Sequence, residues 1–406
     1  MHTLGCIWLS EVRLAPVRQA ALLRACSSGD EFLCMSSRRA GELCGGLTPK
    51  EAIRFQNKSL RRTEEILRRT EDLGGRAVTF YDDDFPAPLR HIPDPPAILY
   101  VRGALPDLTK APAMAVIGKR KASAYGLQTA EKMGYALSRA GVVVVSGMAV
   151  GCDGAAHLGA LKGGSPTIAV LGTPLDRCSP ASHESLMQDI IRYGAVVTEY
   201  SLGRPYTASD FPRRNRLISG LALGVVVCEA ARKSGTLQTA HQALEQGRDV
   251  FAVPGPIGAP NSEGTNELIA SGCAQLVTSP QRVLDEYENR WEALGLRPCD
   301  PVVAPRKEVC GPEAPAADCR PAAGDACGKA PAPVPAAGQG IAAAYAADVP
   351  EGPQQELLAA LSGIMHVDEL IEKSGVPAAD ALQALTFLEI TGLVRRLPGK
   401  RYERTY

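Results

Sequence analysis

Short apolar runs recur along the middle of the chain, separated by segments long enough to form helices. Each run is rich in Val, Ile or Ala and ends near Gly, Ser or Pro. The runs are Met114–Gly118, Gly141–Gly147, Thr167–Gly172, Ala195–Tyr200, Gly224–Glu229, Asp249–Pro254 and Ala274–Val277. Strands that are buried on both faces give such runs, and crossover helices join neighbouring parallel strands. The pattern predicts an α/β fold with a doubly wound, mostly parallel sheet, which binds ligands beyond the carboxyl ends of its strands.

The segment before these runs follows a helical pattern and then a short strand-like one. Residues 1–75 predict a domain of short helices, with helical spacing at Ala15–Ala25 and Thr48–Leu73. Thr48 is a suitable helix cap, and Pro49 suits the first turn behind it. The runs Ala77–Tyr81 and Ala97–Val101 predict irregular strands that lead into the sheet. We therefore expect one sheet domain over residues 76–289.

The segment after the sheet changes composition twice. Ala, Pro and Gly dominate residues 290–352, which bury too little apolar surface to fold, so we predict a flexible linker. Pattern then returns, with expected helices at Gln355–Ser362, His366–Lys373 and Ala378–Thr391 and a hairpin at Gly392–Tyr402 whose tip is Pro398–Gly399. Three helices and a hairpin make a winged helix, expected over residues 353–406.

Composition limits the classes of function. The 406 residues include 44 Lys and Arg and 44 Asp and Glu, so the net charge is zero. This balance excludes a strongly basic surface, and any binding of nucleic acid must come from a local patch. No apolar run approaches the roughly 20 residues of a membrane span, and no export signal is present, so we expect a cytoplasmic protein. The 12 cysteines form no CxxC pair, and we expect reduced thiols; Cys310, Cys319 and Cys327 give little reason to expect a metal.

One basic segment carries the strongest functional signal. Phe211–Gly220 holds three arginines and an asparagine within four positions, directly before a strand-like run. Ser209 or Asp210 can cap a helix there, and Pro212 suits its first turn. The arginines then lie at the positive end of a helix dipole, where phosphate binds readily. This arrangement favours a nucleic-acid backbone or a nucleotide as ligand; the alternative is a solvated helix start with surface ion pairs.

Other strand ends carry residues that favour phosphate. The first run ends in a loop with three cations, Gly118 to Ser123, which lacks the G-x-G-x-x-G dinucleotide fingerprint. Ser234-Gly235-Thr236 opens a helix with free amides and two hydroxyls, although its spacing is not that of a P-loop. Asp153 and His157 share a helix face, where a cap and a packing histidine are favoured over a metal or acid–base pair. Together these loops predict a positive, glycine-lined pocket at the switch point of the sheet.

An ordered series of motifs resembles the DprA/Smf family of DNA-processing proteins. The series comprises Tyr81–Gly103, Val116-Ile117-Gly118-x-Arg120, Ser146-Gly147-x-Ala149-x-Gly151-x-Asp153-x3-His157, Thr167–Leu175, Glu199-Tyr200, Phe211-Pro212-x-Arg214-Asn215-Arg216-x-Ile218, Glu229-x4-Ser234-Gly235-Thr236-x2-Thr239-Ala240, Gly247-Arg248-x2-Phe251-Ala252-Val253-Pro254-Gly255 and Gly264-x-Asn266-x-Leu268-Ile269. Lys119 departs from the family pattern, in which a small or hydroxyl residue usually stands between Gly118 and Arg120. The helices at the N-terminus resemble the SAM-like or helix-hairpin-helix domain of the family, and the tail resembles its winged helix.

The resemblance implies an extended Rossmann-like domain that binds single-stranded DNA. It also implies a non-catalytic homodimer without a cofactor, which protects incoming strands and loads the RecA recombinase onto them during DNA uptake. The residues expected to bind DNA are Gly118, Lys119, Arg120, Ser123, Gly147, Phe211, Arg213, Arg214, Asn215, Arg216, Ser234, Gly235 and Thr236. Among them, arginines would hold phosphates and Phe211 could stack a base.

Two other functions remain open from the residues alone. The first is a phosphoribohydrolase-like enzyme on a related sheet, which would need a carboxylate where this chain has Thr239. The second is a transcription regulator, suggested by the winged helix, whose basic hairpin could contact duplex DNA or a protein. Glu229 ends a buried strand and needs a partner, so we hypothesise that it orients an arginine or caps the Ser234 loop.

Overall fold

The structure is a computed structural model that describes residues 1–293, 352–377, 380–381, 384–385, 388–389, 393–397 and 401–404. The chain divides into two compact units, 1–314 and 315–406. Most of the expected linker, the three cysteines within it and the expected hairpin tip lie outside the described residues, as does part of the expected helix at 378–391. In the described ranges, no helix is long and apolar enough to cross a lipid bilayer.

Six helices form the start of the first unit. They are α1 (His2–Val12), α2 (Pro16–Ala25), α3 (Gly29–Cys34), α4 (Ser37–Cys44), α5 (Pro49–Gln56) and α6 (Arg61–Asp72). Thr48 caps α5 as expected, in a capping box with Glu51. The single helical stretch expected at 48–73 is two helices, because the Asn57 side chain accepts a hydrogen bond from the Ser59 amide. This local turn competes with a continuing helix and ends α5.

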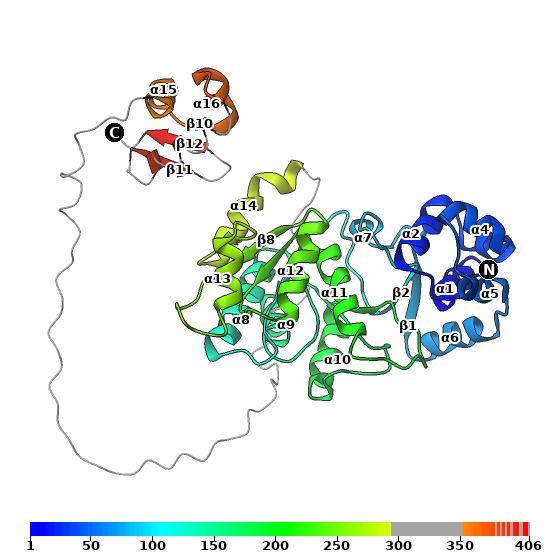
Figure 1. Ribbon diagram of the computed structural model, residues 1–406. Helices are drawn as coiled ribbons and strands as arrows, with labels where there is room; N and C mark the ends of the chain where they lie inside the picture. The colour runs from blue at the N-terminus through cyan, green and yellow to red at the C-terminus, as the bar shows by residue number, and fades with distance from the viewer. Residues whose placement is uncertain are drawn as a thin grey trace, which may run out of the picture. The chain divides into compact units, whose positions relative to one another are not determined.

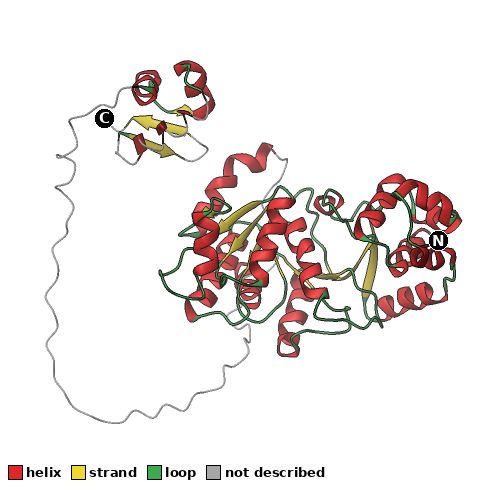
Figure 2. Cartoon of the chain, in the orientation of Figure 1, coloured by secondary structure: helices red, strands yellow, loops and turns green. Residues whose placement is uncertain are grey.

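A nine-stranded sheet forms the centre of the first unit, in the order β1-β2-β6-β5-β4-β3-β7-β8-β9 (Figures 1 and 2). Its strands are β1 (Gly75–Thr79), β2 (Ile98–Gly103), β3 (Ala113–Ile117), β4 (Val143–Ser146), β5 (Thr167–Val170), β6 (Ala195–Thr198), β7 (Gly224–Val227), β8 (Asp249–Ala252) and β9 (Gln275–Leu276). The strands from β6 to β9 in this order pair in parallel, whereas β2 pairs antiparallel with both β1 and β6. This sheet confirms the predicted α/β fold class.

Helices cover both faces of the sheet. They are α7 (Ala87–Arg90), α8 (Ala124–Arg139), α9 (Cys152–Gly163), the 3₁₀ turn η1 (Ala181–His183), α10 (Glu184–Tyr193), α11 (Asp210–Leu221), α12 (Gly235–Glu245), α13 (Glu263–Ala270) and α14 (Pro280–Ala293). On one face, Met114, Val116 and Val144 pack against α8, α9 and α14. On the other, Ala115 and Val145 pack with α11 and α12, which lie side by side in Figure 1. Because both faces are covered, β3 to β7 are buried at every position.

The topological switch point lies at β3. The chain passes from β3 to β4, β5 and β6 on one side of that strand, and then returns to β7, β8 and β9 on the other. The carboxyl ends of β3, β4 and β7 therefore meet at one edge, where open α/β sheets form a crevice.

The second unit contains the winged helix that the sequence predicts. Its elements are α15 (Pro353–Ala360), β10 (Met365–His366), α16 (Val367–Ser374), β11 (Val394–Leu397) and β12 (Arg401–Arg404), with strand order β10-β12-β11. Leu357, Leu370, Leu385 and Tyr402 belong to its apolar core. On the wing, Arg395 pairs with Glu403, so part of the basic charge expected there is neutralised.

Candidate nucleic-acid interface

A groove of about 460 Å³ lies at the switch point, beyond the carboxyl ends of β3, β4 and β7. Its lining comes from the loop after β3, from the start of α9, from the first turns of α11 and from the start of α12. The lining residues are Ile117, Gly118, Lys119, Arg120, Lys121, Ala149, Asp153, Ala208, Phe211, Pro212, Arg214, Asn215, Ile218, Ser234, Gly235, Thr236 and Thr239. We call this the switch-point groove. It brings together nine of the thirteen residues that the sequence singled out for DNA binding.

The loop after β3 supplies the exposed cations of the groove. The side chains of Arg120 and Lys121 are exposed, whereas Lys119 is half-buried and donates from Nζ to Asn261 Oδ1. Gly118 has no room for a side chain, since a Cβ there would lie 2.4 Å from the sulfur of Cys152. The loop can therefore run close against α9 while its two free cations extend into solvent.

Phe211, in the first turn of α11, provides an aromatic surface in the groove. Its ring packs against Gly172, where an added Cβ would lie 2.6 Å from Cδ1 of the ring. The guanidinium of Arg120 lies 5.4 Å from the ring centroid, and the ring of Tyr206 meets Phe211 edge-on at 6.4 Å. The ring is half-buried, so it is held in place and still partly accessible.

Arg214 is a fixed cation on the floor of the groove. It is 3% exposed and donates from Nη1 to the carbonyl oxygens of Gly147, at 2.8 Å, and Val170. Burial lowers the pKa of Arg214 to about 10, and the charge of Asp153 opposes this shift. Burial raises the pKa of Asp153, and Arg214 partly offsets that effect. The acid beside the groove is therefore engaged with an arginine.

The start of α12 presents donors to the groove. Thr236 Oγ1 donates to the carbonyl oxygen of Gly118 at 3.1 Å and ties this helix to the loop after β3. No atom lies within 4 Å of the place where a Cβ of Gly235 would stand. Ser234 Oγ is buried without a hydrogen-bond partner among the described residues. A helix start with an open approach and an unsatisfied hydroxyl is suited to an anionic oxygen.

The structure places four of the expected residues outside the lining of the groove. Arg216 is 5% exposed and donates from Nη1 and Nη2 to both oxygens of Glu199, at 2.7 and 2.8 Å. Its Nε lies 2.6 Å from a carboxylate oxygen of Asp94. Burial opposes the charge of Arg216, but these two acids hold its pKa above the ordinary value. The guanidinium of Arg216 is therefore enclosed by carboxylates and faces away from the groove.

Arg213, Gly147 and Ser123 make up the rest of this group. Arg213 lines a different pocket, beside Glu199. Gly147 acts through its backbone: its carbonyl accepts from Arg214, and a Cβ there would lie 2.6 Å from Asp153 Oδ2. Ser123 caps α8 by accepting from the Gly126 amide at 3.1 Å. These positions support the groove from behind or lie beside it.

Two hypotheses about local partners are wrong. Glu229 neither orients an arginine nor caps the Ser234 loop; it accepts hydrogen bonds from the amide and the hydroxyl of Ser123, at 2.9 and 2.6 Å. At α11, neither expected residue makes a side-chain cap. Asp210 instead accepts from the Thr207 amide and pairs with Arg204 at 2.8 Å.

The prediction of a packing histidine is confirmed. His157 Nδ1 lies 2.8 Å from Thr167 Oγ1, and burial lowers the pKa of this histidine to about 3. The cap expected beside it is not found, since α9 has no side-chain cap, and Asp153 lines the groove instead. Asn261, which holds Lys119, was missed, because nothing in the sequence pairs residues 142 positions apart.

Two family models match this chain, one in each of its two units. Residues 76–288 match the family described as DNA recombination-mediator protein A, and residues 341–400 match the DprA winged helix domain. Protein Smf of Escherichia coli is 35% identical over 356 residues, which cover 87% of this chain and 84% of that protein. DNA processing protein DprA of Streptococcus pneumoniae is 45% identical over 212 residues, covering 52% of this chain and 74% of that protein.

A solved structure is also similar. The X-ray structure of DNA processing protein A from Streptococcus pneumoniae has a TM-score of 0.62 and 34% sequence identity to this chain. The match covers 70% of this chain and 97% of the other.

Proposed function

The chain belongs to the DprA/Smf family of DNA-processing proteins, and from that membership we propose that its switch-point groove binds single-stranded DNA. Phosphates of the strand contact Arg120, Lys121 and the amides at the start of α12, and a base stacks on Phe211. The protein thereby protects the strand and delivers it to the RecA recombinase, and it acts as a homodimer; the recombinase and the dimer rest on family membership alone.

One observation carries the proposal: exposed cations and an aromatic ring share one groove. The Arg120 guanidinium lies 5.4 Å from the Phe211 ring centroid, and Arg120 itself is exposed. Phosphate contacts and stacking do not read the edges of bases, so this combination suits an unpaired strand of any sequence. Three further features of the lining, Arg214, Ser234 and the open space at Gly235, favour negative charge.

A phosphoribohydrolase-like enzyme is the alternative, and the groove supports it less well. Such a site needs a carboxylate that is free to act on a bound nucleotide. At the corresponding position, this chain has Thr239, whose hydroxyl donates to the carbonyl oxygen of Gly235. Asp153, the acid in the lining, faces Arg214. We therefore propose a binding protein that performs no chemistry on the strand.

The test is a titration of the full chain with oligothymidylate at several salt concentrations, for wild type and Arg120→Ala. We expect the dissociation constant of the variant to rise about tenfold, which corresponds to about 1.4 kcal/mol for one charge-assisted contact. The slope of log affinity against log salt should fall by about 0.7, because one fewer counterion is released.

Arg139→Ala is the matched control for this experiment. Arg139 is an exposed arginine at the end of α8, and that helix starts at the groove edge and runs back toward the opposite edge of the sheet. The control should bind the oligonucleotide as wild type does. Equal affinity and slope in wild type and Arg120→Ala, or an equal loss in both variants, contradicts the proposal.

A further inference from the structure

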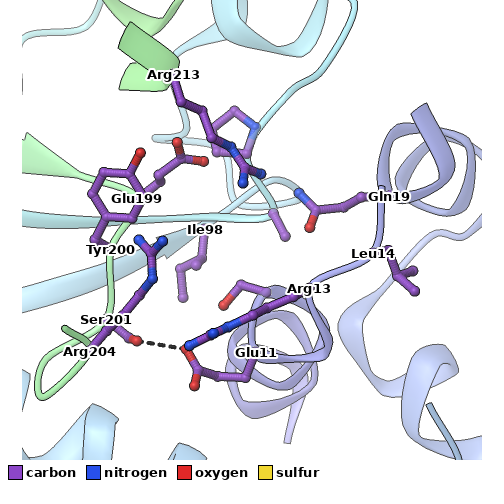
Figure 3. Close-up of a pocket in the computed structure, with 13 residues that line it drawn as sticks. Glu11, Arg13, Leu14, Gln19, Ile98, Glu199, Tyr200, Ser201, Arg204 and Arg213 are labelled. Atoms are coloured by element: carbon purple, nitrogen blue, oxygen red, sulfur yellow. Dashed lines mark hydrogen bonds between the residues drawn. The ribbon is translucent and has the colours of Figure 1, made fainter. Parts of the chain in front are cut away.

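A second pocket lies on the other side of the first turn of α11, within the first unit. It has a volume of about 120 Å³ and is lined by the turn between α1 and α2, the residues before β2, and the segment from β6 to α11 (Figure 3). Phe211 faces the switch-point groove, whereas Arg213, two residues later, lines this second pocket. We call it the Arg213 pocket.

Both carboxylates in the lining of the Arg213 pocket are already engaged. Glu11 accepts from Ser201 Oγ at 2.6 Å and from Arg62 Nε at 2.9 Å. Glu199 accepts from both terminal nitrogens of Arg216. These oxygens leave little acceptor capacity for further donors.

The donors in the lining are less fully used. Figure 3 shows Arg213, Arg204 and Gln19 extending toward the pocket from three sides. Arg204 pairs with Asp210 through Nη2 and lies over the ring of Tyr200, with 4.3 Å between guanidinium carbon and ring centroid, which leaves its other nitrogens available. Among the described residues, the guanidinium groups of Arg213 and Arg13 have no hydrogen bond or ion pair. The pocket therefore combines paired acids with unpaired cations.

The local charge is also unbalanced. We count the described charged residues that line the pocket together with those in the ion pairs linked to them. They are five arginines (Arg13, Arg62, Arg204, Arg213 and Arg216) and four carboxylates (Glu11, Asp94, Glu199 and Asp210). One positive charge remains for a bound anion to neutralise.

Arg13 also holds a backbone conformation that arginine rarely adopts. It is the residue after α1, with φ of 54° and ψ of 55°, in the left-handed region that glycine enters without penalty. Its neighbour Leu14 is buried, and the amide of Ala15 is held by Glu51. This fixed turn orients the Arg13 side chain along the pocket.

We propose that the Arg213 pocket binds a phosphate group. The two unpaired guanidinium groups, of Arg13 and Arg213, offer planar, paired donors of the kind that phosphate oxygens accept. The Gln19 amide donates one N–H to the Pro95 carbonyl oxygen at 3.4 Å and keeps a second donor. A volume of about 120 Å³ is large enough to hold a phosphate group. The phosphate comes either from the backbone of the strand in the switch-point groove or from a free phosphate; the first source rests on the proposed function.

The experiment has two arms, both with the full chain. In the first arm, inorganic phosphate is titrated by calorimetry at constant ionic strength. We expect saturable binding to wild type, a loss of at least about tenfold in Arg213→Ala, and partial recovery in Arg213→Lys, which keeps the charge without the fork. Arg139→Ala should bind phosphate as wild type does.

In the second arm, oligothymidylates of increasing length are titrated against wild type and Arg213→Ala. If the strand supplies the phosphate, the variant loses affinity for long oligonucleotides and keeps wild-type affinity for the shortest that bind. Inorganic phosphate then competes with long oligonucleotides more strongly than with short ones. If a free phosphate is the ligand, the first arm shows binding and the second shows no difference at any length.

The variant Arg13→Gly distinguishes a lost phosphate contact from a loss of folded protein. Glycine relieves the left-handed strain and removes the guanidinium, so this variant should melt at or above the wild-type temperature and still lose phosphate affinity. The proposal is overturned if Arg213→Ala matches wild type in both arms. If Arg120→Ala loses DNA binding and keeps phosphate binding, the two sites act independently. The phosphate titration of the first arm tests the Arg213 pocket even if the switch-point groove does not bind DNA.

Discussion

Three arginines within the first two turns of α11 occupy three different environments. Arg213 faces the second pocket, Arg214 is buried against carbonyl oxygens below the groove, and Arg216 is enclosed by two carboxylates. Successive helix positions differ by about 100° in direction, so neighbouring cations on one helix meet different surroundings. A dense basic motif thus divides into a residue that lines a pocket with an unpaired guanidinium and residues whose guanidinium groups are buried against other parts of the fold.

We predict that Arg216→Ala destabilises the protein by about 3–5 kcal/mol, because Glu199 and Asp94 would lose their shared counter-charge in a buried place. Burial opposes ionisation of Glu199, yet Arg216 at present holds the pKa of that carboxyl below its ordinary value. Urea unfolding of wild type and variant measures the loss. Arg120→Ala, at an exposed position, should unfold like wild type. A stable Arg216→Ala protein with weakened DNA binding would show that Arg216 serves the interface instead.

The sequence predicted which residues line the groove better than it predicted the role of each one. Gly118, Arg120, Phe211 and the Ser234 loop meet as expected, because each follows a strand whose carboxyl end lies at that edge of the sheet. The role of Arg216 depends on acids that lie 17 and 122 positions earlier in the chain. No local pattern encodes such pairings, so a cation in a motif cannot be assigned to solvent or core from its neighbours.

At the scale of elements, the strands were the most predictable parts. Each of the seven expected strands after residue 113 overlaps an observed strand. For β3 to β7 the reason is that burial on both faces requires a continuous apolar run, whereas β9 is exposed. Helix ends were less predictable. The expected helix at 48–73 is interrupted by a turn at Asn57, and the start of α11 uses Asp210 for an ion pair with Arg204 instead of a cap. Polar side chains with several available partners decide such ends.

The start of α5 gives a prediction about pH. Glu51 is buried, which opposes its ionisation, but hydrogen bonds from the Thr48 hydroxyl and the amides of Ala15 and Thr48, together with Arg18, lower its pKa to about 2. A carboxyl whose pKa is lowered on folding stabilises the protein above its unfolded value, near 4.5, and this contribution is lost as the pH falls toward 2.

We therefore expect Glu51→Gln to lower the free energy of unfolding by about 2–3 kcal/mol at pH 7. The difference between variant and wild type should shrink as the pH falls from about 4.5 toward about 2, since wild-type Glu51 then becomes protonated as well. Urea unfolding across this range measures both quantities. A difference that does not change with pH would mean that packing, and not the charge of Glu51, stabilises the α1–α2 turn.

At the scale of the whole molecule, one apolar core joins the N-terminal helices to the sheet. Leu22 and Phe32 of the helices, Leu99 of β2 and Val197 of β6 belong to the same buried cluster. Tyr81 donates from its hydroxyl to the Leu23 carbonyl across this junction, at 3.0 Å. The winged helix has a separate core of its own. The groove is thus supported from the N-terminal side of the chain.

We predict that a chain ending at residue 293 binds oligothymidylate with the affinity of the full chain, because the described lining of the groove lies between residues 117 and 239. Titration of both proteins with single-stranded and double-stranded oligonucleotides measures this. Loss of duplex binding alone would assign duplex contact to the winged helix. Weaker binding of the single strand by the shortened chain would mean that the tail takes part in gripping it.

The pairing of β2 with β6 sets an order of events during synthesis on the ribosome. β2 ends at Gly103, and the strand that covers its free edge begins at Ala195. About 90 residues must therefore be added between them, which takes roughly 5–18 s at bacterial rates of translation. Until then, the β1–β2 hairpin of the nascent chain presents an open edge to other polypeptides. That edge stays open from the completion of β2 until the emergence of β6.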